Sequence, residues 1–168
     1  MLQPVRRRTW APRGQTPALR CWDRRDRLSF IAALTVSPRR RHLGLYFDAY
    51  GPNHNVATGE VCVMVLGMLR RFPRGIVLVL DRLPAHRSAA ARLLRSHGDR
   101  IDVEWLPAYA PDLNPVEGLW AHAKHGDLPN YCPDHAEALR LAVEDSIGTA
   151  ARSQPLLRSF FGLTGLRL

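Results

Sequence analysis

The chain has 168 residues, the size of one domain, and 46% of them are hydrophobic, enough for a substantial core. It contains no apolar run of about 18 residues, and no apolar stretch follows its basic, proline-rich N-terminus. We therefore expect neither a membrane-spanning helix nor a secretory signal. Three cysteines without a CxxC pair favour a reducing compartment, the cytoplasm.

Positive charge dominates, since 24 Lys and Arg residues stand against 15 Asp and Glu residues, a formal net charge of +9. Lys124 is the single lysine, so nearly all of this charge is arginine, whose guanidinium group binds phosphate oxygens in a bidentate manner. A basic surface attracts polyanions, which makes nucleic acid the expected partner; the alternative is a solvated surface without a ligand. The arginines cluster at residues 6–8, 24–25, 39–41 and 70–71.

The first half of the chain predicts a loop, a hairpin and a helix. Prolines and glycines break up the N-terminal segment, which favours a loop. Residues 28–36 (LSFIAALTV) and 43–50 (LGLYFDAY) predict two strands joined by a basic turn at 38–41. From Thr58 to about Phe72, apolar residues recur at helical spacing, and Thr58 is the expected cap.

The second half predicts alternating strands and helices, followed by helices alone. Residues 76–80 (IVLVL) indicate a strand buried on both faces, and 101–106 (IDVEWL) indicate another. Between them we expect a helix from about Ser88 to His97, closed by Gly98. Further helices are expected at Glu117, near Asp134 and near Ser153. This order predicts an α/β fold with a mixed sheet.

Two carboxylates occupy special backbone positions. Asp81 stands at the carboxyl end of the predicted 76–80 strand. Glu117 opens a helix whose start is marked by Asn114 as cap and Pro115 in the first turn. Carboxylates brought together at strand and helix ends suit a hard divalent cation. The structural alternatives are a turn-forming Asp and a Glu that completes a capping box and suits the helix dipole.

The segments that carry these carboxylates are 81–86 (DRLPAH) and 111–120 (PDLNPVEGLW). They resemble the motifs with the second and third catalytic carboxylates in the DDE-superfamily endonuclease domain of mariner-like bacterial insertion-sequence transposases. The second segment matches at every position, whereas Arg82 stands where the family has Asn. Residues 10–17 (WAPRGQTP) are similar to a further loop of the family.

The resemblance implies a ribonuclease H-like mixed sheet flanked by helices, and metal-dependent DNA cleavage and strand transfer during DNA transposition. Asp81 and Glu117 would be the catalytic residues and the ligands of two Mg²⁺ or Mn²⁺ ions, which activate the nucleophile and stabilise the leaving oxygen. Trp120 would be a core residue. The expected DNA-binding residues are His86, Arg87, Lys124, Arg39, Arg40 and Arg41.

The family's first catalytic Asp lies on a strand before the loop matched by residues 10–17, and residues 1–9 contain no Asp or Glu. The resemblance therefore implies that residues 1–168 form one N-terminally truncated, partial catalytic domain without its first strand or an upstream helix-turn-helix domain. Asp48 is a candidate substitute but lies in the wrong strand, and Asp23 and Asp26 are weaker candidates. We expect impaired activity, or activity only with an upstream transposase fragment; a second copy of the chain, in a homo-oligomer, is the other expected protein partner.

Two alternatives remain open. The chain could be a catalytically inactive, basic DNA-binding remnant, or a regulator that competes with a full-length transposase for DNA ends or subunits. A different possibility is zinc, because His122, His125, Cys132 and His135 supply suitable donor types. The family pattern implies no metal at those four positions.

Overall fold

The computed structural model describes residues 5–18, 27–166 and 168. The strands of this part are β1 (Ser29–Val36), β2 (Leu43–Tyr50), β3 (Ile76–Leu80) and β4 (Ile101–Trp105). The helices are α1 (Thr58–Arg71), α2 (Pro84–His97), α3 (Pro115–Ala121), α4 (Ala136–Ala151) and α5 (Gln154–Leu163). A short 3₁₀ turn, η1 (Pro111–Leu113), precedes α3, and a π-helical turn, η2 (His122–Asp127), continues it.

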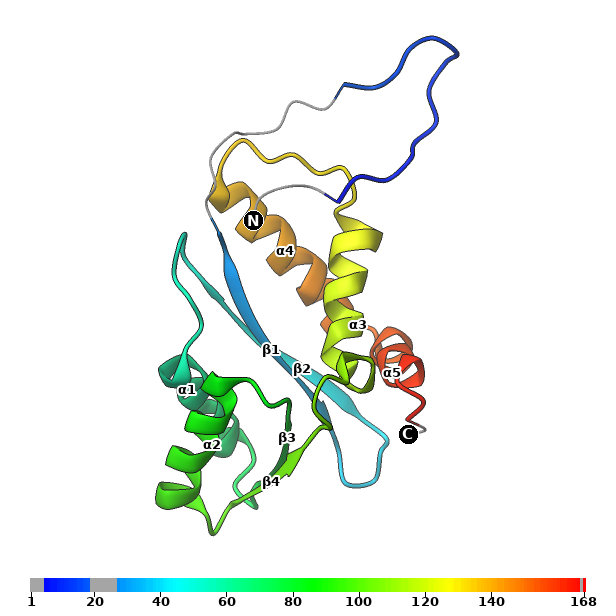
Figure 1. Ribbon diagram of the computed structural model, residues 1–168. Coiled ribbons are helices and arrows are strands. Elements are labelled where there is room, and N and C mark those ends of the chain that lie inside the picture. Colours follow the sequence, from blue (N-terminus) through cyan, green and yellow to red (C-terminus); the bar gives the residue numbers. More distant parts are fainter. Residues whose placement is uncertain (1–4, 19–26, 167) are drawn as a thin grey trace.

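The β1–β2 hairpin is antiparallel and separates two hydrophobic cores. Because side chains alternate along a strand, Ile31 and Tyr46 pack with α1, α2, β3 and β4 on one face. Ala32 and Phe47 pack with α3, α4 and α5 on the other face, where Trp120 is partly buried as expected. Figure 1 shows α1 and α2 on one side of the hairpin and α3, α4 and α5 on the other.

β3 and β4 are parallel and, within the described residues, form a sheet separate from the hairpin. The α/β fold is as predicted, but the expected mixed sheet is present in two parts. The side chain of Leu78 is buried against α1 and α2, whereas Val77 and Val79 are 64% and 57% exposed. The prediction that this strand is buried on both faces is therefore wrong, because described residues cover only one face of it.

The starts of three helices differ from the sequence prediction by a few residues. The cap of α1 is Ala57, not Thr58; its N–H donates to Glu60 Oε2 over 2.9 Å. Hydrogen bonds from backbone N–H groups and from His54 lower the pKa of Glu60. α2 begins at Pro84, earlier than Ser88, since proline fits the first helical position. α4, expected near Asp134, is capped by His135, whose Nδ1 accepts from Ala138 N.

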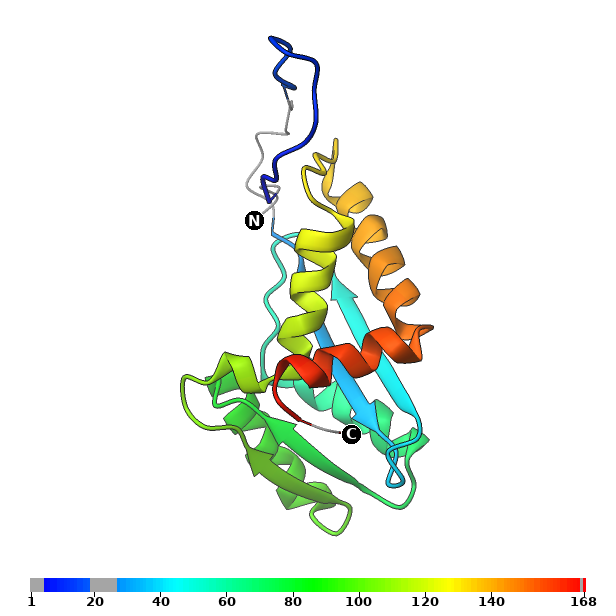
Figure 2. The ribbon, with the colours of Figure 1, turned by 90° about the vertical axis from the view of Figure 1, so that its right-hand side faces the viewer.

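Residues 5–18 form no helix or strand, as predicted, and extend away from the body of the molecule (Figures 1 and 2). This loop is tied to the segment after η2 by Asn130. The Asn130 side chain accepts from Arg7 N over 2.8 Å and donates to Arg7 O over 2.9 Å. In the view of Figure 2, α3 and α5 lie in front of the hairpin and the β3–β4 sheet lies below it.

Candidate active site

Asp81 follows β3 directly, and two donors hold one of its carboxylate oxygens. Asp81 Oδ1 accepts from Leu83 N over 3.1 Å and from His86 Nδ1 over 2.5 Å. The turn that brings His86 back to Asp81 arises because Pro84 starts α2 four residues after Leu80, the last residue of β3. The Asp81 side chain keeps 35% of its surface exposed, so its second oxygen remains available to a ligand.

Glu117 lies in the first turn of α3, at a start that the sequence specifies well. Asn114 Oδ1 accepts from Val116 N over 3.2 Å, and Pro115 takes the first helical position, as predicted. The N–H of Asn114 donates to Pro111 O, so Glu117 does not complete a capping box. Within the described residues the exposed Glu117 carboxylate has no hydrogen bond or ion pair, and the helix N-terminus favours its negative charge.

The segments that carry Asp81 and Glu117 both leave the β3–β4 sheet at the same end, the carboxyl ends of its two parallel strands. Leu80 and Trp105 are paired in register, and Leu106 N donates to Leu80 O over 2.8 Å. In α/β sheets, ligands bind beyond the carboxyl ends of parallel strands, which is where Asp81 stands. The arrangement therefore supplies carboxylate oxygens at a position where a ligand can reach them.

The residues present fit part of a site for Mg²⁺ or Mn²⁺. Carboxylates are the ligands that these hard cations prefer. However, no group of three or more His, Cys, Asp or Glu side chains in the described part of the chain lies close enough to hold a metal ion. Asp81 and Glu117 therefore do not belong to a group of three or more such side chains within the described residues.

Arg82 does not direct its charge onto Asp81. Its Nε donates to Leu106 O over 3.1 Å, which holds the side chain toward the end of β4. That Arg82, in the place of the family's Asn, puts a cation near the metal site stays a prediction, and Asp81 Oδ1 itself accepts from Leu83 and His86.

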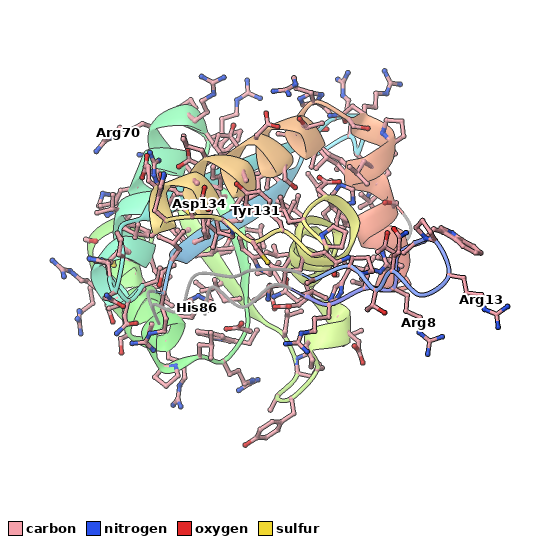
Figure 3. All side chains as sticks on the ribbon, turned by 90° about the horizontal axis from the view of Figure 1, so that it is seen from above. Arg8, Arg13, Arg70, His86, Tyr131 and Asp134 are labelled. Carbon is pink, nitrogen blue, oxygen red and sulfur yellow. The ribbon has the colours of Figure 1, made fainter. Side chains whose placement is uncertain are left out.

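The predicted DNA-binding residues are spread over different elements. Arg87 is exposed on α2, one residue after His86, and Lys124 is exposed in the π-helical turn after α3. Arg39, Arg40 and Arg41 are exposed in the β1–β2 turn. That turn is fixed by Arg158, whose Nη2 donates to Arg40 O and Arg41 O over 3.1 and 3.0 Å. Basic side chains also line opposite sides of the molecule, with Arg70 on one and Arg8 and Arg13 on the other (Figure 3).

Comparison with known proteins identifies the family. The family model of the DDE superfamily endonuclease matches residues 1–129. The chain belongs to this family. No curated protein sequence matches it. The predicted resemblance to the DDE superfamily is thereby confirmed, and the matched range includes Asp81 and Glu117.

The fold of this DDE superfamily endonuclease is ribonuclease H-like. A chain in the crystal structure of the Mos1 strand transfer complex superposes with a TM-score of 0.59 at 18% sequence identity. The match covers 96% of the present chain and 46% of the Mos1 chain, so the present chain spans about half of that neighbour. At this identity the likeness shows the fold alone. No helix in the described residues is long and apolar enough to cross a membrane.

Of the three carboxylates considered as substitutes for the first catalytic Asp, the structure describes Asp48. Asp48 is exposed on β2 opposite Ile31, where it borders a shallow depression with Met64 and Met68 of α1. It belongs to no metal-binding group within the described residues. Asp23 and Asp26 lie outside the described residues, as do the arginines at 24–25.

The zinc hypothesis is wrong. His122 Nε2 lies 3.4 Å from Asp127 Oδ2, and Asp127 also accepts from Ser146 Oγ over 2.7 Å. His135 uses Nδ1 to cap α4. The four side chains are described, and they form no cluster of metal ligands.

Sequence reasoning missed two aromatic residues near the carboxylates. Trp105, the last residue of β4, lines a cavity together with Arg82 and Arg87. Tyr109 is fully exposed in the loop between β4 and η1, with a left-handed backbone (φ 58°). Period-two alternation along β4 places Trp105 on the side of Ile101, so this signal could have located Trp105. No sequence pattern predicts the conformation of Tyr109.

Proposed function

We propose that the chain is part of a transposase catalytic domain that cleaves DNA phosphodiester bonds and transfers strands with divalent metal ions. The observation that carries this proposal is that Asp81 directly follows β3, and that Glu117 lies in the first turn of α3, on the segment that continues from the same end of the parallel strand β4. Both side chains are accessible, and both stand in motifs of the DDE superfamily endonuclease. A cytoplasmic protein acting on DNA agrees with the net charge of +9.

In this function each residue has a separate task. Asp81 and Glu117 would hold the Mg²⁺ or Mn²⁺ ions, which when bound activate the attacking hydroxyl and stabilise the leaving oxygen. His86 orients Asp81 by donating to Oδ1, so that the other oxygen faces the ion. Arg87 and Lys124, both exposed, would hold backbone phosphates and so position the DNA without reading its sequence.

The two carboxylates are too few for full activity, so we propose that a third comes from a polypeptide segment outside these 168 residues or from another subunit. The unpaired edges of β1 and β3 support this proposal. In the described residues, β1 pairs with β2 alone and β3 with β4 alone, although both strands pack against α1. A further strand between β1 and β3 would pair with the free backbone N–H and C=O groups of both and would lie next to Asp81. By itself the chain is expected to cleave DNA very slowly.

The second candidate function is a DNA-binding regulator without catalysis. Its supporting observation is the spread of exposed arginines over opposite sides of the molecule (Figure 3), combined with a metal site of two carboxylates. Such a protein would compete with a complete transposase for DNA ends or subunits. Its DNA affinity would not depend on Asp81 or Glu117.

The two functions are separated by nicking of supercoiled plasmid DNA in Mg²⁺ or Mn²⁺, with DNA binding measured on the same preparations. The proposal predicts slow, metal-dependent nicking that Asp81→Asn and Glu117→Gln each abolish while DNA binding persists. Metal-independent nicking, or nicking that survives both substitutions, would contradict the catalytic assignment. Binding without any nicking, even after addition of an upstream transposase segment, would favour the regulator.

A further inference from the structure

A cavity of about 430 Å³ opens between α2 and the end of β4. Its size lies within the range of ordinary small-ligand sites. It is lined by Arg82, Arg87, Ala90, Ala91, Leu94 and Trp105. Arg82 and Arg87 directly follow Asp81 and His86 in the chain, so the cavity adjoins the candidate metal site without sharing its carboxylates.

The lining combines a positive rim with an apolar floor. The rim carries two guanidinium groups and no carboxylate, and the hydrogen bond from Arg82 Nε to Leu106 O fixes one of them in place. The floor consists of the buried Ala90, the half-exposed Leu94 (42%) and the partly buried indole of Trp105. A ligand of matching chemistry has an anionic group next to a flat, apolar ring.

We propose that this cavity binds one unstacked nucleotide of single-stranded DNA, with the base against Trp105 and the flanking phosphates on Arg82 and Arg87. The proposal deepens the proposed function, on which it rests, by naming a binding site for the strand beside the cleavage site. Single-strand sites combine aromatic stacking platforms with cationic grooves, the two features found here. In duplex DNA the base is stacked and paired, so the cavity selects single strands.

The neighbouring residues make a DNA strand the fitting source of this nucleotide. Consider a DNA strand with one phosphate at Asp81. Its neighbouring phosphates would then lie near Arg82, the next residue in the chain, and near Arg87 in the first turns of α2. A free nucleotide would present the same chemistry. It would lack the phosphates on both sides that allow two separate guanidinium groups to contribute.

The test measures binding of a short fluorescein-labelled oligothymidylate to the full chain by anisotropy, in EDTA, so that cleavage plays no part. Trp105→Leu keeps an apolar side chain but removes the stacking face, and we expect about 10-fold weaker binding. Trp105→Phe keeps an aromatic face and should bind nearly as well as the unaltered chain. Arg87→Ala should weaken binding and reduce the slope of log affinity against log salt by about 0.7.

Two controls make the result specific to the cavity. Arg95→Ala removes the same charge from the same helix outside the cavity and should leave affinity almost unchanged. The oligonucleotide should also quench intrinsic tryptophan fluorescence, and Trp105→Phe should remove the part of that quenching that arises at Trp105, one of four tryptophans, although binding persists. Because the fluorescence measurement uses Trp105→Phe, it does not depend on whether Trp105→Leu folds stably.

The proposal is overturned if Trp105→Leu binds the oligonucleotide as tightly as the unaltered chain, or if Trp105→Phe leaves the quenching undiminished. Equal losses from Arg95→Ala and Arg87→Ala would also overturn it, since they would indicate general attraction to a basic surface. Failure of the proposed function is recognised separately. It would appear as absent metal-dependent nicking, a reaction that the oligonucleotide assay in EDTA does not measure.

Discussion

At the residue scale, the contact between His86 and Asp81 decides how the first carboxylate is presented. With Nδ1 donating to Asp81 Oδ1 over 2.5 Å and Leu83 N donating to the same atom, the carboxylate cannot rotate freely. A residue that holds a metal ligand in this way tunes the affinity for the ion without touching it. His86 is in this account a positioning residue, and this role is a prediction.

Substitution of His86 tests that role. His86→Ala removes the donor, and we expect the metal concentration needed for half-maximal nicking to rise by about 10-fold to 100-fold. His86→Asn can place an amide N–H near the position of Nδ1 and should restore most of the loss. The measurement is nicking rate against Mg²⁺ concentration. An unchanged metal requirement in His86→Ala would show that His86 has no such role.

At the element scale, the start of α3 sets the position of Glu117. The Asn114 side chain accepts from Val116 N, and Pro115 fixes the first helical residue, so the carboxylate emerges from a well-defined first turn. α5 starts in the same way, with Ser153 Oγ accepting from Leu156 N over 3.3 Å. The two helices therefore offer a matched pair of caps, of which one adjoins the candidate site.

Asn114→Ala and Ser153→Ala should each lower the free energy of unfolding by about 1 kcal/mol, because each leaves a helix N–H without its cap. Urea denaturation measures this loss. Nicking should fall in Asn114→Ala alone, since only that cap positions Glu117. A similar fall in nicking for both variants would mean that general destabilisation, not the placement of Glu117, causes it.

The sequence predicted much at this scale, and the failures have physical reasons. The strand at residues 43–50 and the cap at Asn114 were predictable because alternation and capping are local patterns. Asp81 and Glu117 were found through motifs. The early start of α2 at Pro84 and the exposure of Val77 and Val79 were not predicted, because they depend on which other elements cover each residue. The π-helical turn after α3 likewise has no local signature.

At the scale of the whole molecule, the hairpin connects two cores, and the candidate site lies where the β3–β4 sheet meets α3. In the described part of the chain β1 and β3 are not paired with each other, and no group of three or more candidate metal ligands is present. Both observations agree with one explanation, a further strand that carries a further carboxylate. Metal binding by the chain alone should therefore be weak, yet confined to Asp81 and Glu117.

Titration of the chain with Mn²⁺, followed by the electron paramagnetic resonance signal of the free ion, tests this central claim most directly. We predict weak binding that Asp81→Asn and Glu117→Gln each abolish. Asp112→Asn, which removes an exposed carboxylate from the same segment as Glu117, should leave it unchanged. If the Asp81 and Glu117 variants bind Mn²⁺ as the unaltered chain does, the two carboxylates do not form a metal site and the account is contradicted.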